Sequence, residues 1–182
     1  MSTDLESVIA AELQPREKLL WSGRPAQGIR LRKADTLLIP FSLLWTGFAV
    51  FWEWEALGRS HDSFAPIWGI PFVLIGLYLV FGRFIVDSWR RSRTYYGLTR
   101  ERALIISGGE TQTFPLRTLS GLSIRQGGGR YGTLRLGEAA KPGMEFFAGS
   151  SWPGMGRYSP PAFEFIEDAR QVHELILSAQ RQ

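Results

Sequence analysis

The chain has 182 residues, a formal net charge of +4 and no cysteine. This length fits one domain, or a small domain with an anchor. The lack of cysteine excludes disulfides, thiolate nucleophiles and cysteine metal sites, and two histidines leave little room for a histidine-built metal centre. No arrangement of nucleophile, base and carboxylate is recognisable, so we predict a chain without metal, cofactor or enzymatic activity.

The first 34 residues predict a short helix followed by a strand. Apolar residues fall on one helical face between positions 3 and 13, and Pro15 ends this pattern. Residues 17–23 are typical of a strand. Because so short a helix is marginal alone, we expect it to pack on the soluble domain or on a partner. We assign residues 1–34 to a cytoplasmic N-terminal segment.

Two long apolar runs follow, at about residues 36–54 and 66–86. A helix needs about 20 mostly apolar residues to cross the hydrocarbon core of a membrane. The runs are separated by a short polar stretch, so they predict a transmembrane helical hairpin over residues 35–88 rather than two core helices of a soluble protein. Small residues in the second run would allow the helices to approach closely; these are Gly69, Gly76 and Gly82.

Charged residues gather where the hairpin begins and ends. Asp35 is placed to cap the first membrane helix. Arg83 and Asp87 are four positions apart, and we predict that they pair near the inner headgroups.

The basic residues at these ends also predict orientation and partners. Lysine and arginine beside short membrane spans are held in the cytoplasm, so we predict a multi-pass protein with both termini cytoplasmic. Attraction to anionic headgroups, about 1 kcal/mol per residue, explains the basic residues better than nucleic acid, which we do not expect as a partner. The candidate headgroup contacts are Arg30, Arg32, Lys33, Arg90, Arg91 and Arg93.

From residue 94 to 182 the pattern changes to short segments separated by turn-forming residues. Such spacing suggests a β-barrel or sandwich, and a helical apolar pattern over 167–180 predicts a helix that caps it. The expected fold class is therefore α+β, with a cytoplasmic domain over residues 94–182. The expected strands cover residues 94–99, 102–107, 112–116, 119–125, 131–136, 145–148 and 162–166.

Several of these segments resemble one family. YYGLTRERALIISG resembles the opening strands of bacterial pleckstrin-homology-like domains in small membrane proteins, and TFPLRTLSGLSIRQ resembles their next strands. GTLRL and FIEDARQVHELI are similar to their late strand and C-terminal helix, and EKLLWSGRP to the segment before their membrane hairpin. The resemblance implies a pleckstrin-homology-like (PH-like) barrel or sandwich capped by an amphipathic helix, anchored in a bacterial inner membrane.

A run of three glycines followed by Arg130 invites comparison with phosphate-binding loops. The Walker pattern requires a lysine followed by serine or threonine after its last glycine, and this chain has no such residues there. The run predicts a hairpin or flexible loop. Anion binding by Arg125 and Arg130 beside it is the alternative.

These features predict a binding or scaffolding module at the cytoplasmic face of the membrane. It would dock a protein partner or assemble with itself as a homo-oligomer. Two alternatives stay open: sensing of lipid headgroups by the PH-like domain and the basic residues beside the membrane, and a role as accessory subunit of a membrane transporter or enzyme.

Overall fold

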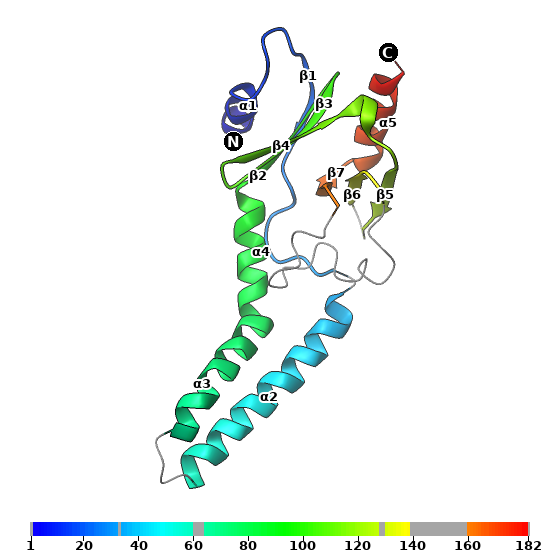
Figure 1. Ribbon diagram of the computed structural model, residues 1–182. Helices are drawn as coiled ribbons and strands as arrows, with labels where there is room; N and C mark the ends of the chain where they lie inside the picture. Colours follow the sequence, from blue (N-terminus) through cyan, green and yellow to red (C-terminus); the bar gives the residue numbers. More distant parts are fainter. Residues whose placement is uncertain (1, 33, 60–63, 128–129, 139–159, 182) are drawn as a thin grey trace.

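Two apolar helices project from a pair of small antiparallel sheets (Figure 1). The structure is a computed structural model, and it describes residues 2–32, 34–59, 64–127, 130–138 and 160–181. The fold class is α+β, as the sequence predicts. Both ends of the chain lie on the side of the sheets, remote from the tip of the hairpin.

The hairpin consists of two long helices. The first is α2, Asp35–Arg59. The second begins as α3, Phe64–Leu77, passes through a π-helical turn, η1, Tyr78–Gly82, and continues as α4, Arg83–Ser92. Both helices are long and apolar enough to cross a membrane, although core helices of soluble proteins can pass the same test. Here 22% of each apolar stretch is buried, whereas a soluble core helix is mostly buried.

Two of the three glycines singled out in the sequence lie where the helices of the hairpin meet. A Cβ atom at Gly76 would lie 3.1 Å from the Cα atom of Thr46 on α2, and one at Gly69 would collide with the carboxylate of Glu53. Gly82 does not serve this purpose, because a Cβ there would meet the ring of Tyr78 on its own helix. Since Thr46 and Glu53 are seven residues apart, as are Gly69 and Gly76, the contacts recur after two helical turns.

The first sheet has the strand order β1-β2-β3-β4 and begins before the hairpin. Its first strand, β1, Leu19–Gly23, pairs antiparallel with β2, Thr94–Thr99. The hairpin is therefore inserted in the connection between two neighbouring strands. The remaining strands are β3, Arg102–Ser107, and β4, Glu110–Pro115.

The N-terminal segment is part of the same folded unit as this sheet. Helix α1, Ser2–Ala10, packs on β1 and β2. Its fully buried Ile9 lies over Gly97, where a Cβ atom would be 3.2 Å from the methyl group of Ile9. The sequence left open whether this helix packs on the soluble domain or on a partner. In the structure it packs on the sheet.

An ion pair ties the segment before β1 to the start of β3. Arg102 donates through Nε to Oε1 of Glu17 (2.9 Å) and through Nη2 to Oε2 (2.7 Å). The Glu17 side chain is 3% exposed. The hydrogen bond from Arg102 lowers the pKa of Glu17 from 4.5 to about 2, with backbone N–H donation from Gln14 and the Thr99 hydroxyl adding to the effect against the penalty of burial.

The second sheet has the order β5-β6-β7 and is followed by the C-terminal helix. A short 3₁₀ turn, η2, Leu116–Thr118, separates it from β4. The strands are β5, Leu122–Gln126, β6, Tyr131–Leu136, and β7, Ala162–Glu167, and the helix is α5, Ala169–Gln180. Neither sheet closes into a barrel within the described residues. The strand predicted at 145–148 lies outside them.

Helix α5 begins two residues later than the sequence suggests. Glu167 is still the last residue of β7, and Asp168 has φ +49°, so the chain turns sharply before the helix starts. The inner face of α5, with Val172 and Ile176, joins the core formed by the two sheets. Phe163 is fully buried there, with its ring centroid 4.8 Å from that of Tyr96 and 5.7 Å from that of Trp21. Residues from both sides of the hairpin thus share one core.

Candidate functional site at the junction of hairpin and sheets

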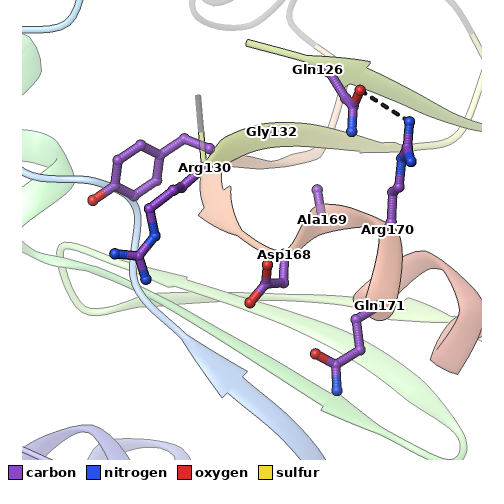
Figure 2. Close-up of a pocket in the computed structure, with 8 residues that line it drawn as sticks. Gln126, Arg130, Gly132, Asp168, Ala169, Arg170 and Gln171 are labelled. Atoms are coloured by element: carbon purple, nitrogen blue, oxygen red, sulfur yellow. Dashed lines mark hydrogen bonds between the residues drawn. The ribbon is translucent and has the colours of Figure 1, made fainter. Parts of the chain in front are cut away.

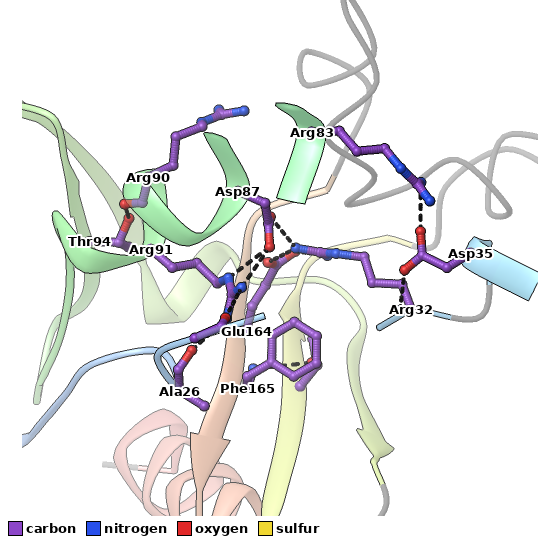
Figure 3. A network of polar contacts seen from close by, with 12 residues as sticks. Ala26, Arg32, Asp35, Arg83, Asp87, Arg90, Arg91, Thr94, Glu164 and Phe165 are labelled. Atoms are coloured by element: carbon purple, nitrogen blue, oxygen red, sulfur yellow. Dashed lines mark hydrogen bonds and ion pairs between the residues drawn. The ribbon is translucent and has the colours of Figure 1, made fainter. Parts of the chain in front are cut away.

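Charged side chains converge where the hairpin meets the sheets (Figure 3). We call this cluster the junction. It combines residues from the linker after β1, from the first turn of α2, from α4 and from β7. Its members are Arg32, Asp35, Arg83, Asp87, Arg91 and Glu164.

Arg32 connects the linker to both other parts of the molecule. Its guanidinium donates from Nη1 to Oε1 of Glu164 (3.0 Å) and from Nη2 to Oε2 (2.8 Å), a two-pronged pair with β7. Nη2 also reaches Oδ1 of Asp87 on α4 at 3.1 Å. Burial by itself would lower the pKa of Arg32, but the charges and hydrogen bonds of Glu164, and then of Asp87, outweigh it and raise the pKa above its ordinary value. Arg32 therefore stays charged.

Arg91 is 5% exposed and holds α4 against the linker. Its Nε donates to Oδ2 of Asp87 at 2.9 Å, one helical turn earlier. Its terminal nitrogens donate to the carbonyl oxygens of Ala26 (2.5 Å) and Gly28 (2.6 Å). One buried guanidinium thus satisfies two backbone carbonyls and one carboxylate.

Asp35 and Arg83 form the part of the junction next to the apolar helices. Nη1 of Arg83 donates to Oδ1 of Asp35 at 2.6 Å, and the side chains are 6% and 8% exposed. The other carboxylate oxygen of Asp35 accepts from the backbone N–H of Arg32 at 2.6 Å. Nε and Nη2 of Arg83 are buried without a hydrogen-bond partner.

The Arg83–Asp35 pair corrects the sequence-based pairing of Arg83 with Asp87. Asp87 lies four positions from both Arg83 and Arg91 and could pair with either along the helix. It faces Arg91 and Arg32, while Arg83 faces the start of α2. Asp35 is the first residue of α2, and in place of the predicted helix cap its carboxylate binds the N–H of Arg32 and the side chain of Arg83, 48 positions away.

The six predicted headgroup residues fall into different environments. Arg32 and Arg91 are engaged inside the junction. Arg30 is half-buried, with its guanidinium 4.6 Å from the ring centroid of Tyr131 on β6. Arg90 and Arg93 are exposed on or just after α4, and Arg93 lies 4.1 Å over the ring of Trp89. Lys33 lies outside the described residues.

Sequence reasoning found most junction residues but not their partner on β7. The spacing of Arg83 and Asp87 draws attention to both residues, although as partners of each other, and the basic residues stand out beside the apolar runs. Glu164 carries no local signal, because it lies in a strand among apolar neighbours and meets Arg32 only through the tertiary fold.

The second predicted site, around the glycine run, is a shallow depression at the start of α5 (Figure 2). Its volume is about 340 Å³, and it is lined by Arg130 and Arg170 together with Gln126 and Asp168. Arg130 pairs with exposed Glu167 at 3.6 Å, and Arg170 donates to Gln126. Arg125 does not line it. The carboxylate of Glu167 beside Arg130 and that of Asp168 in the lining give the depression mixed charge.

The junction has the chemistry of a structural connection. Each of its carboxylates is matched by arginine, and within the described residues no group of three His, Asp or Glu side chains could hold a metal ion. His173, the histidine of α5, is half-buried and lies outside the junction. No protein-family model, curated protein or solved structure matches this chain.

Proposed function

We propose that this chain is a membrane-anchored, PH-like binding module of a bacterial inner membrane. It docks a protein partner or a second copy of itself at the cytoplasmic face, and it has no catalytic role. The observation that carries this proposal is the insertion of an exposed apolar hairpin between two paired strands of a small soluble domain. Both β1 and β2 therefore connect the domain directly to the hairpin, which holds the domain at the membrane.

The membrane location is supported by the surface of the hairpin. Large apolar side chains on both helices are exposed, including Leu44 (75%), Phe48 (64%) and Trp68 (64%). Soluble proteins rarely leave so much contiguous apolar surface in water. Arginine and tryptophan at the inner end, Arg93 over Trp89, are typical of the headgroup region.

The PH-like assignment is supported by the order of elements. Antiparallel strands followed by one C-terminal helix are the order that the sequence resemblance implies, and the described residues have this order. In this layout the membrane hairpin occupies the connection between the first two strands.

The docking surface that we propose is the free edge of β4. This strand has β3 as its neighbour within the described residues, and Gln112 and Thr113 on it are exposed. A peptide segment can add to such an edge through backbone hydrogen bonds. The remaining outer strand of this sheet, β1, is next to α1, so β4 is the more accessible edge.

Crosslinking from single cysteines tests this proposal, because the chain contains no cysteine of its own. Thr113→Cys on β4 would be crosslinked in native membranes with a short bifunctional reagent, with Ala11→Cys after α1 as the matched exposed control. We expect the cysteine at position 113 to give a single crosslinked product, either with a second copy of the chain or with one stoichiometric partner protein. The cysteine at position 11 should give none. Equal adducts at both positions, or none at position 113, would contradict docking at β4.

A second function, sensing of anionic lipid headgroups, is favoured by one observation. Arg90 and Arg93 are exposed beside the inner end of the hairpin, while Arg32 and Arg91 are neutralised inside the junction. Their charge would face the headgroup layer. A third role, as accessory subunit of a transporter or membrane enzyme, would give one constant partner in the same crosslinking experiment.

A further inference from the structure

The linker between β1 and α2 exposes apolar side chains next to the hairpin. Ile29 and Leu31 are 69% and 65% exposed, whereas Arg30 and Arg32 between and after them are half-buried. Such alternation is typical of an extended segment, whose successive side chains point to opposite sides. The linker therefore has one basic side and one apolar side.

The basic side of the linker faces the second sheet. Arg30 lies over the ring of Tyr131 on β6, and Arg32 pairs with Glu164 on β7. Figure 1 shows the linker passing between this sheet and the start of α2. Ile29 and Leu31 alternate with these arginines along the linker and are exposed, so they point away from the second sheet.

Two hydrogen bonds fix the position of the linker along the axis of the hairpin. At its upper end the carbonyl oxygen of Gly28 accepts from Arg91, and at its lower end the N–H of Arg32 donates to Asp35. The Arg91 guanidinium pairs with Asp87, which lies four residues beyond Arg83 on one helix, about 6 Å along its axis. If the hydrocarbon core ends at the Asp35–Arg83 pair, the linker spans the headgroup layer, which is about 5–8 Å thick on each side.

We propose that the linker lies in the headgroup layer of the inner leaflet, with Ile29 and Leu31 inserted toward the lipid chains. The occupant of this surface is the lipid bilayer, because the two exposed side chains lie in the segment that leads directly into α2, where apolar side chains are exposed from Leu37 onward. Exposed apolar residues beside basic ones anchor peripheral segments in this way. The inference rests on the proposed membrane location, and it adds a second attachment that sets which face of the soluble domain lies on the membrane.

Depth-dependent fluorescence quenching tests the proposal. Ile29→Cys, Leu31→Cys, Leu44→Cys and Gln112→Cys would each be labelled with an environment-sensitive fluorophore in the full-length protein. The labelled proteins would be reconstituted into phosphatidylcholine–phosphatidylglycerol vesicles that carry a nitroxide lipid, placed either near the headgroup or deep in the acyl chain. All four side chains are exposed, so labelling leaves the core intact.

The proposal expects three distinct patterns. Labels at Ile29 and Leu31 are quenched more by the shallow nitroxide and show blue-shifted emission. The label at Leu44 is quenched more by the deep nitroxide, and the label at Gln112 by neither. Quenching at Leu44 without quenching at Ile29 and Leu31 would overturn the interfacial linker but leave the membrane hairpin standing. No quenching at Leu44 would overturn the membrane location itself, and the linker proposal with it.

Discussion

Arg32 and Glu164 are 132 positions apart, yet they form a two-pronged ion pair with distances of 3.0 and 2.8 Å. One residue lies just before the hairpin and the other in the last strand. The pair therefore joins the start of the apolar hairpin to the second sheet, and Asp87 adds helix α4 through the same guanidinium. Any tilt of the hairpin against the sheets would have to break it.

We expect Glu164→Gln to loosen this connection. Glutamine keeps the shape of the side chain but removes the charge that faces Arg32, so the free energy of unfolding should fall by about 2–3 kcal/mol. Thermal unfolding of the full-length protein in detergent measures the change. The control is Glu167→Gln, since Glu167 is 52% exposed and its pair with Arg130 is a surface pair worth about 0–1 kcal/mol. Equal effects of the two variants would contradict a special role for Glu164.

Acid should weaken the attachment of the N-terminal segment through Glu17. The folded state holds the pKa of Glu17 at about 2, below the ordinary 4.5. A lowered carboxyl pKa stabilises the fold above the ordinary value, and this contribution is lost as the pH falls from about 4.5 to about 2. The protection of the β1 amides against hydrogen exchange, relative to the intrinsic rate at each pH, should fall over this range.

Glu17→Gln provides the comparison for that titration. The variant lacks the carboxylate, so exchange in β1 should already be faster at neutral pH and should respond less to acid. Glu110→Gln, at an exposed turn position at the start of β4, is the matched control. An unchanged acid response in Glu17→Gln would assign the titration to another group.

Packing within the hairpin predicts a contrast between two glycines. A Cβ at Gly76 would meet the backbone of Thr46 at 3.1 Å, whereas nothing lies within 4 Å of a Cβ at Gly47. Gly76→Ala should therefore push the helices apart and lower the midpoint of thermal unfolding in detergent. Gly47→Ala should leave it unchanged or raise it slightly, because alanine favours a helix by about 1 kcal/mol over glycine. A lower midpoint for Gly47→Ala than for Gly76→Ala would show that the helices do not pack as described.

The Asp35–Arg83 pair predicts non-additive substitutions. Arg83→Met leaves Asp35 without its charged partner at a buried position, which should cost about 3–5 kcal/mol. The double variant Arg83→Met with Asp35→Asn should lose less free energy of unfolding than the sum of the losses in the two single variants, because no unpaired charge is left. Unfolding in detergent, measured for the four members of the cycle, gives the coupling. Strictly additive losses would mean that the two side chains do not interact.

The exposed arginines predict a preference for anionic lipid. Arg90→Glu with Arg93→Glu should reduce the enrichment of phosphatidylglycerol around the protein, at about 1 kcal/mol per residue at low salt. Native mass spectrometry of the protein released from mixed-lipid nanodiscs measures this enrichment. Arg117→Glu, exposed in η2 away from the hairpin, is the control. Unaltered enrichment in the double variant would remove the basis for lipid sensing.

The elements of this fold are largely predictable because their signals are local. The apolar runs mark the hairpin, and the alternation and turn residues after position 93 mark β2 to β7. Element ends are less accurate. The second helix runs to Ser92 rather than 86, because Arg83 and Arg91 find partners that let the helix continue out of the apolar stretch. Helix α5 starts at Ala169, because Asp168 adopts a left-handed conformation that pattern alone does not reveal.

The sequence by itself determined the kind of chain this is: two helices of membrane-spanning length, followed by short strands and a closing amphipathic helix, with basic residues at the inner ends of the apolar runs. Composition and periodicity depend on near neighbours, so one chain suffices to read them. Only the tertiary structure decided that β1 pairs with β2 across the hairpin and that Arg32 meets Glu164. Those contacts join residues tens to more than a hundred positions apart, and they form because the strands and α5 bury their apolar faces in one shared core.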